Sequence, residues 1–213
     1  GELAAFGGDY RVVALDLLGT GQSDRVERWP DDWWQLGAET AIALMDHLDV
    51  EQGVVMGTSG GAVAALLAAL YAPERVRAVI ADSVVLRQPP DVLRTEVQGR
   101  RQVHPDAVAF WQHAHWEDWK QVVEADSDLM LRLANRGGEW FDSGLVGMAC
   151  PVLITGSLRD SALYNGAEQM VEMAGQIPES QLVLFNGGDH PLMWTRPAAF
   201  QRVAFEFMNG LES

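Results

Sequence analysis

The sequence predicts an α/β protein in which a mostly parallel β-sheet is flanked by helices and interrupted by a helical insertion. Short apolar runs alternate with helix-like segments along most of the chain, the pattern of a parallel sheet covered on both faces. The alternation stops over residues 86–145, which are polar and rich in tryptophan. We therefore expect a core formed by residues 1–85 and 146–213, with residues 86–145 forming a helical cap.

Five short apolar runs are typical of buried parallel strands. They are Arg11–Leu17, Val54–Met56, Val76–Ala81, Val152–Thr155 and Gln181–Phe185. Helices are expected to end near residue 8 and to cover residues 33–48, 62–72, 167–174 and 197–208. Proline at the first position of the last helix and Asn209-Gly210 at its end are typical helix boundaries.

The central motif of the chain is Gly57-Thr58-Ser59-Gly60-Gly61, which lies between an apolar strand and an alanine-rich helix. This G-x-S-x-G pattern is that of a nucleophile elbow, which exposes a serine hydroxyl at the tip of a sharp, strained turn. Gly57 and Gly61 are expected to remove the side chains that would crowd the turn. The N–H of Gly60, at the start of the helix, is expected to donate to a developing oxyanion.

Three polar residues follow three predicted strands: Ser59, Asp160 and His190. The carboxyl ends of parallel strands meet at one edge of a sheet, where ligands bind. We expect Ser59 to be the nucleophile, His190 the general base and Asp160 the acid that orients the imidazole. Asp82 also ends a predicted strand and is the rival acid, whereas Asp189 adjoins His190 and is poorly placed to bond its ring.

The predicted cap contains Trp111, Trp116, Trp119 and Trp140, which we expect mostly to form its small core, with one or two lining a substrate pocket. His113 and His115 lie two positions apart on a helix, so their side chains face apart and no metal site is expected. The loop Leu18–Asp24 has no third glycine and no following helix, which excludes a dinucleotide fingerprint.

The composition narrows the class of partner. The formal net charge is −15 and the pI is near 4.5, so nucleic acid and anionic membranes would be repelled. Cys150 is the only cysteine, which excludes an intrachain disulfide and predicts a small core residue. No apolar run is long enough to cross a bilayer and no signal peptide is visible, so we expect a cytoplasmic protein.

These motifs together resemble the α/β-hydrolase superfamily, in its serine-nucleophile branch. Residues 11–16 with Gly19–Asp24 are similar to the family's strand and D-x-x-G-x-G-x-S-D loop, and residues 57–61 to its elbow. Residues 156–160 are similar to its acid loop and residues 188–191 to its histidine loop. The resemblance implies the α/β-hydrolase fold and a Ser-Asp-His order along the chain, and it implies no cofactor.

One departure from the family pattern concerns the start of the sequence. The first recognisable strand, residues 11–17, corresponds to the family's fourth, and nothing matches the His-Gly loop that gives a second oxyanion N–H. We expect an N-terminally truncated form or fragment. Either another chain supplies the missing segment in trans, or residues 11–17 shift to pair directly with the elbow strand. A homo-oligomer is a further expected partner state. Loss of one oxyanion donor would lower the rate roughly 100- to 1000-fold.

The expected function is hydrolysis of small ester-type substrates through an acyl-enzyme, with a small molecule as the partner. The alternatives are a C–C bond hydrolase, a cofactor-free perhydrolase, or a hydrolase-like protein that binds a ligand without turnover. The missing loop favours the non-catalytic alternative, and the Ser59, Asp160 and His190 set favours the enzyme.

Overall fold

The structure, a computed structural model, describes residues 1–102 and 104–211, and the chain divides into two compact units. The first unit comprises Gly1–Ala14, Trp34–Leu86 and Phe141–Ser213, and the second comprises Leu15–Trp33 and Arg87–Trp140. The second unit thus contains most of the expected cap together with Leu15–Trp33, a segment expected to belong to the core.

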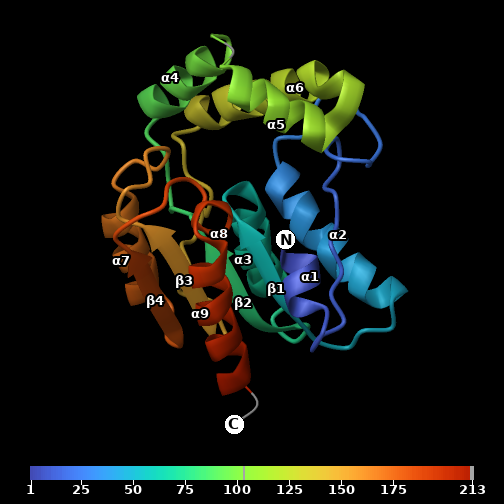
Figure 1. The fold of residues 1–213 in the computed structure, drawn as a ribbon, viewed down its shortest axis with the longest axis vertical. Helices are drawn as coiled ribbons and strands as arrows, with labels where there is room; N and C mark the ends of the chain where they lie inside the picture. Colours follow the sequence, from blue (N-terminus) through green and yellow to red (C-terminus); the bar gives the residue numbers. More distant parts are fainter. Residues whose placement is uncertain (103, 212–213) are drawn as a thin grey trace. The chain divides into compact units, whose positions relative to one another are not determined.

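The first unit is built on a parallel four-stranded sheet in the order β1-β2-β3-β4 (Figure 1). The strands are β1 (Gly53–Thr58), β2 (Val76–Asp82), β3 (Val152–Ser157) and β4 (Ser180–Phe185). Its helices are α1 (Glu2–Phe6), α2 (Trp33–His47, of which Trp34 onwards belongs to this unit), α3 (Gly60–Tyr71), α7 (Gly166–Gln176), α8 (Leu192–Thr195) and α9 (Pro197–Gly210). Four of the five predicted strands are therefore confirmed.

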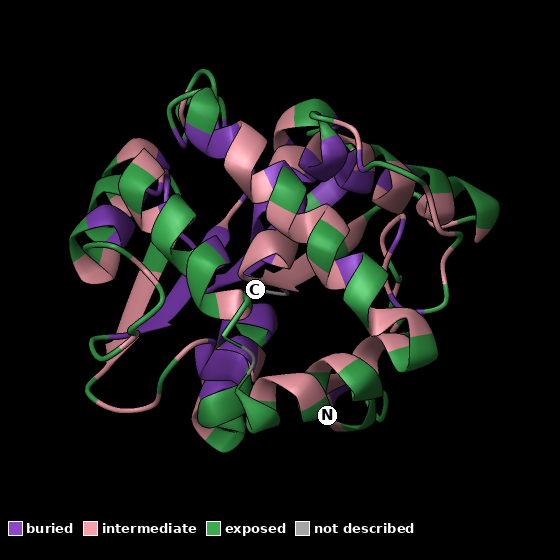
Figure 2. Ribbon diagram, turned by 90° about the horizontal axis from the view of Figure 1, so that it is seen from above, coloured by how far each residue is buried: buried purple, intermediate pink, exposed green. Residues whose placement is uncertain are grey.

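Helices cover both faces of this sheet. On one face, Phe200 of α9 and Phe6 of α1 pack with Ile80 and Leu153, and the rings of Phe6 and Phe205 stack at 4.5 Å. On the other face, α3 and α7 pack against the strands. There Gly156 leaves the space that Met170 of α7 fills. The central strands β2 and β3 are almost wholly buried (Figure 2).

The predicted strand over Arg11–Leu17 is wrong. These residues have no regular secondary structure, and β1, the elbow strand, pairs only with β2 among the described residues. The alternative that residues 11–17 shift to pair with the elbow strand is therefore wrong too. An apolar run becomes a strand only where a neighbour satisfies its backbone groups, and apolarity alone does not supply one. Supply of a segment by another chain stays a prediction.

The second unit is helical. It contains α4 (Pro90–Arg100), α5 (Pro105–His115), the 3₁₀ turn η1 (Trp116–Asp118) and α6 (Trp119–Asn135), with α4 and α5 packed against α6. Its core includes Trp29, buried and stacked on Trp33 at 4.6 Å, and Leu129 and Leu133 of α6. Of the four tryptophans expected there, Trp111 stacks on Trp119 at 5.6 Å, whereas Trp116 is 51% exposed.

Candidate active site

Ser59 lies between β1 and α3 with φ 52° and ψ −123°, a backbone conformation that residues with a side chain rarely adopt. Hydrogen bonds hold the turn: the Ser59 N–H donates to the carbonyl oxygen of Asp82 at 2.9 Å, and the Ser59 carbonyl accepts from Ala62 and Val63 in α3. Backbone bonds to the neighbouring strand and helix therefore stabilise the strained serine, as a nucleophile elbow requires.

The two glycines of the motif differ. A Cβ on Gly57 would lie 2.2 Å from the carbonyl oxygen of Gly61, so β1 and α3 approach this closely only with glycine at position 57. A Cβ on Gly61 would have no neighbour within 4 Å. The expectation that Gly61 is also needed to clear the turn is therefore wrong.

The structure brings Ser59, His190 and Asp160 together. The Ser59 Oγ lies 2.9 Å from His190 Nε2, and His190 Nδ1 lies 2.8 Å from Asp160 Oδ2. The Asp160 side chain is 1% exposed and the His190 side chain 22% exposed. The three side chains come from the turn after β1, the loop after β3 and the loop after β4. This geometry permits proton transfer from the hydroxyl to an imidazole whose other nitrogen bonds a carboxylate.

Asp189 joins the acid loop to the histidine loop. Its Oδ1 accepts from the N–H and the hydroxyl of Ser161, at 3.0 and 2.9 Å, and from the N–H of His190 at 2.9 Å. These hydrogen bonds lower the pKa of the Asp189 carboxyl. Ser157 adds a second link, because its hydroxyl donates to the carbonyl oxygen of Gly188 at 2.9 Å. Asp189 thus positions the loops while Asp160 contacts the ring.

The rival acid, Asp82, is fully buried at the end of β2. Its Oδ1 accepts from the Thr155 hydroxyl at 2.7 Å, and its Oδ2 accepts from the Thr58 hydroxyl at 2.8 Å and the Met193 N–H at 3.0 Å. Burial raises the pKa of the Asp82 carboxyl, against the opposite effect of these hydrogen bonds. The carboxylate hydrogen-bonded to the imidazole is that of Asp160.

Gly60 is the first residue of α3, so its N–H has no acceptor within the helix and points to the amino-terminal end beside Ser59. Trp34 of α2 packs behind it: a Cβ on Gly60 would lie 3.3 Å from the Trp34 Nε1. The position suits the expected oxyanion donor.

His115, which the sequence pairs with His113, hydrogen-bonds the backbone of a loop. Its Nδ1 accepts the N–H of Gly21 at 3.2 Å, within the second unit. Among the described residues, no group of three or more His, Cys, Asp or Glu side chains is arranged to hold a metal ion. Cys150 is buried, as a core residue would be, and burial raises the pKa of its thiol.

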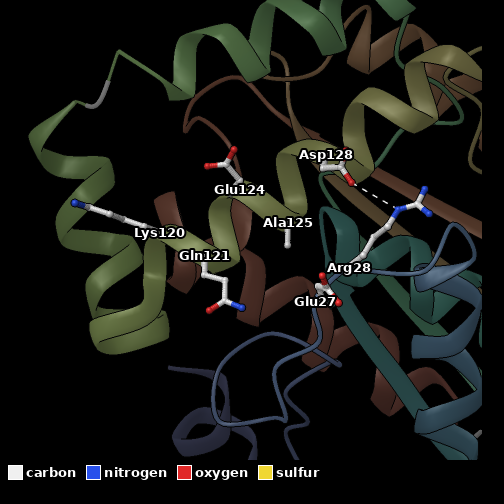
Figure 3. A pocket seen from close by; sticks show the side chains of 7 residues that line it. All are labelled: Glu27, Arg28, Lys120, Gln121, Glu124, Ala125 and Asp128. Carbon is white, nitrogen blue, oxygen red and sulfur yellow. Dashed lines mark ion pairs between the residues drawn. The ribbon is translucent and has the colours of Figure 1, made fainter.

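The second unit also carries an open surface hollow of about 720 Å³ (Figure 3). Glu27 and Arg28 face the α6 side chains across it, and Arg28 Nε lies 3.9 Å from Asp128 Oδ2. Its charges have both signs and its residues include none of the candidate catalytic side chains, so it is not assigned a function.

Sequence reasoning missed the connecting roles of Asp82, Asp189 and Ser157. Each role depends on a partner from another loop or strand, and sequence spacing carries no signal for such pairs. The one usable signal was position, because Asp82 and Ser157 end predicted strands where loops converge.

The sequence is similar to a protein family and to several hydrolases of known sequence. A sequence profile of the family described as "alpha/beta hydrolase fold" matches residues 2–110. A protein of Caulobacter sp. (strain K31) named "Putative carbamate hydrolase RutD" is 25% identical over 98% of this chain and 84% of its own length. A 2-hydroxymuconate semialdehyde hydrolase of Pseudomonas putida is 39% identical over 72 residues, 33% of this chain and 25% of that protein.

Solved structures agree on the fold. An esterase from Thermogutta terrifontis superposes with a TM-score of 0.78 at 19% identity, over 100% of this chain and 84% of that chain. NosK from Streptomyces actuosus superposes with a TM-score of 0.82 at 18% identity, over 100% of this chain and 91% of that chain. In the part of this chain that the structure describes, no helix is long and apolar enough to cross a membrane. The profile match shows that the chain belongs to the α/β-hydrolase-fold family, and the parallel sheet and the strained serine turn agree with it.

Proposed function

We propose that this protein is a serine hydrolase that cleaves small ester-type substrates through an acyl-enzyme. The observation that carries the proposal is the continuous hydrogen-bonded series from Ser59 through His190 to Asp160, at 2.9 and 2.8 Å. The esterase and hydrolase names of similar proteins support the same reaction class.

The first half of the reaction forms the acyl-enzyme. The Ser59 Oγ attacks the ester carbonyl carbon while its proton passes to His190 Nε2, and the carbonyl π electrons move to oxygen. The Gly60 N–H stabilises this oxyanion, and Asp160 stabilises the imidazolium. The tetrahedral intermediate collapses, the C–O bond to the alcohol breaks, and His190 returns the proton to the leaving alkoxide.

Water completes the cycle. The oxygen of a water molecule attacks the acyl carbon while His190 takes a proton from that water. His190 then returns the proton to the Ser59 oxygen as the carboxylic acid leaves. The chain's own groups therefore balance both proton transfers.

Burst kinetics with p-nitrophenyl acetate and butyrate test the proposal. We expect about one equivalent of nitrophenolate per chain in a burst, followed by turnover. Ser59→Ala should abolish both, whereas Ser180→Ala, at the opposite end of the sheet, should leave both unchanged. Equal hydrolysis by the wild type and Ser59→Ala would overturn the proposal and favour a ligand-binding role.

A second candidate is hydrolysis of a carbon–carbon bond next to a carbonyl. The 39% identity over 72 residues to a 2-hydroxymuconate semialdehyde hydrolase favours it, since a semialdehyde of that kind has no ester bond to cleave. Comparing turnover of that semialdehyde with that of p-nitrophenyl butyrate would decide which substrate class the site prefers.

A further inference from the structure

We propose that Asp82 is a positioning residue that holds the nucleophile turn and the histidine loop in register by hydrogen bonds. The inference rests on the proposed function, because the register in question is that between Ser59 and His190. It gives the rival acid a role that requires no contact with the imidazole.

The Asp82 carboxylate reaches three chain segments at once. Thr58, whose hydroxyl donates a hydrogen bond to it at 2.8 Å, directly precedes Ser59. Met193, whose N–H it accepts at 3.0 Å, lies three residues after His190. Thr155, at 2.7 Å, lies on β3, the strand that leads to the Asp160 loop. One fully buried side chain therefore links the segments that carry all three candidate catalytic residues.

Ser83 strengthens the link to the histidine loop. Its hydroxyl accepts the Leu192 N–H at 2.8 Å, beside the Met193 N–H that Asp82 accepts. Leu192 and Met193 begin α8, whose own N-cap, Pro191, supplies no side-chain bond. The end of β2 therefore satisfies the first N–H groups of the helix that follows His190, which fixes where that helix starts.

The backbone of the same residue bonds the nucleophile, since the Asp82 carbonyl oxygen accepts the Ser59 N–H at 2.9 Å. This bond survives any substitution of the side chain. A side-chain variant therefore removes the links of the carboxylate to Thr58, Thr155 and Met193, and its bond with the neighbouring Ser83 hydroxyl. It leaves the strained serine turn its backbone bond.

The test compares Asp82→Ala and Asp82→Asn with Val76→Ala, a control at the other end of the same strand, where the side chain is 1% exposed. The readout is the second-order rate constant for labelling of Ser59 by a fluorophosphonate, with the unfolding midpoint measured in parallel. Asp82→Ala should label about 100-fold more slowly than Val76→Ala, because small displacements of reacting groups have effects of that size.

Asp82→Asn should restore labelling to within about threefold of the wild type. The asparagine amide can turn its oxygen to Thr58 and Met193 and its NH₂ to the Thr155 oxygen, which keeps the links without the charge. Labelling of Asp82→Ala as fast as that of Val76→Ala would overturn the proposal, because the role would then be merely structural. Labelling of Asp82→Asn as slow as that of Asp82→Ala would overturn it as well.

A second readout separates this proposal from the proposed function. In ¹⁵N-histidine NMR, the proton between His190 Nδ1 and Asp160 should shift or broaden in Asp82→Ala and stay unchanged in Val76→Ala and Asp82→Asn. If the wild type does not react with the probe, the proposed function fails, and the NMR comparison still decides the role of Asp82. Should Asp82→Ala not fold, Thr58→Val removes one link at constant shape; unchanged labelling and an unchanged His190 proton would overturn the proposal.

Discussion

Two glycine-bearing turns of this molecule differ in what holds them in place. The turn at Ser59 is fixed by its own backbone and by the strand beside it. The loop Leu18–Asp24 of the second unit also has backbone bonds, such as that from the Gly19 N–H to the Asp24 carbonyl oxygen at 3.0 Å. It is held in addition by two side chains, one from Arg25 next to it and one from His115 in α5. Gly21 donates to His115, and Arg25 bonds the carbonyl oxygens of Thr20, Gly21 and Ser23.

Arg25 is the centre of the second arrangement. Besides the three carbonyl bonds, its Nε and Nη2 bond both carboxylate oxygens of Asp118, at 2.7 and 3.1 Å. A turn held by backbone contacts depends on shape, and a loop held by charged side chains depends on pH and salt as well. The two should therefore fail under different perturbations.

The largest effect is expected from Gly57→Ala. Its Cβ would lie 2.2 Å from the Gly61 carbonyl oxygen, so β1 and α3 must move apart. We expect a loss of about 1–3 kcal/mol in the free energy of unfolding, and esterase activity about 100-fold lower. Urea unfolding and p-nitrophenyl acetate turnover measure the two quantities.

Gly61→Ala is the matched control, because its Cβ would meet no atom within 4 Å. It should keep the stability and the rate of the wild type. A Gly57→Ala variant that behaves like Gly61→Ala would show that the backbone does not set the shape of the turn.

A smaller and local effect is expected from Arg25→Met. Residues 19–24 should exchange their amide hydrogens at least about tenfold faster, because the hydrogen bonds from a charged donor that close the loop are lost. Turnover at Ser59 should change less than in Gly57→Ala. Hydrogen exchange read by mass spectrometry gives the local rates.

Arg28→Met is the control for the Arg25 variant. The Arg28 side chain is 63% exposed, and its guanidinium comes no closer than 3.5 Å to the Asp31 carboxylate. It should leave exchange in residues 19–24 unchanged. Equal acceleration in the two variants would mean that charge in the segment, and not the bonds of Arg25, orders the loop.

The smallest effect is a pH dependence of the same loop. Burial, then the charge of Arg25, lowers the pKa of His115, with Asp118, Asp126 and Asp16 acting in the opposite direction. Above the unfolded pKa of about 6.5 the neutral ring accepts the Gly21 N–H. As pH falls from there through the lowered folded pKa, the unfolded state binds more protons, so this contribution to stability is lost.

Amide hydrogen exchange of residues 19–24, corrected for the intrinsic exchange rate at each pH, should therefore become faster below pH 6.5. His115→Asn should remove the acceleration, while His113→Gln, an exposed neighbour on α5, should keep it. A profile that is identical in the wild type and His115→Asn would exclude His115 as its source.

This contrast explains what could be predicted from the sequence. The elbow is local, so the residues from Val54 to the start of α3 indicated it, and the strand ends brought Asp160 and His190 to the same edge. The strand predicted over residues 11–17 is wrong because a strand needs a pairing partner as well as apolar side chains. Asp82 and Asp189 act through partners far away in sequence, as Arg25 does with Asp118, and no spacing rule signals such pairs.

The place of β1 in the sheet also bears on how the protein behaves in concentrated solution. Within residues 1–102 and 104–211, one edge of β1 has no strand beside it, and Val54 on that strand is 36% exposed. Such an edge is a template for pairing between molecules, with aggregation as the result. The net charge of −15 opposes this at pH 7, and that protection vanishes near the pI of about 4.5. Storage and crystallisation are therefore best attempted well above that pH, where the same charges keep the edges of neighbouring molecules apart.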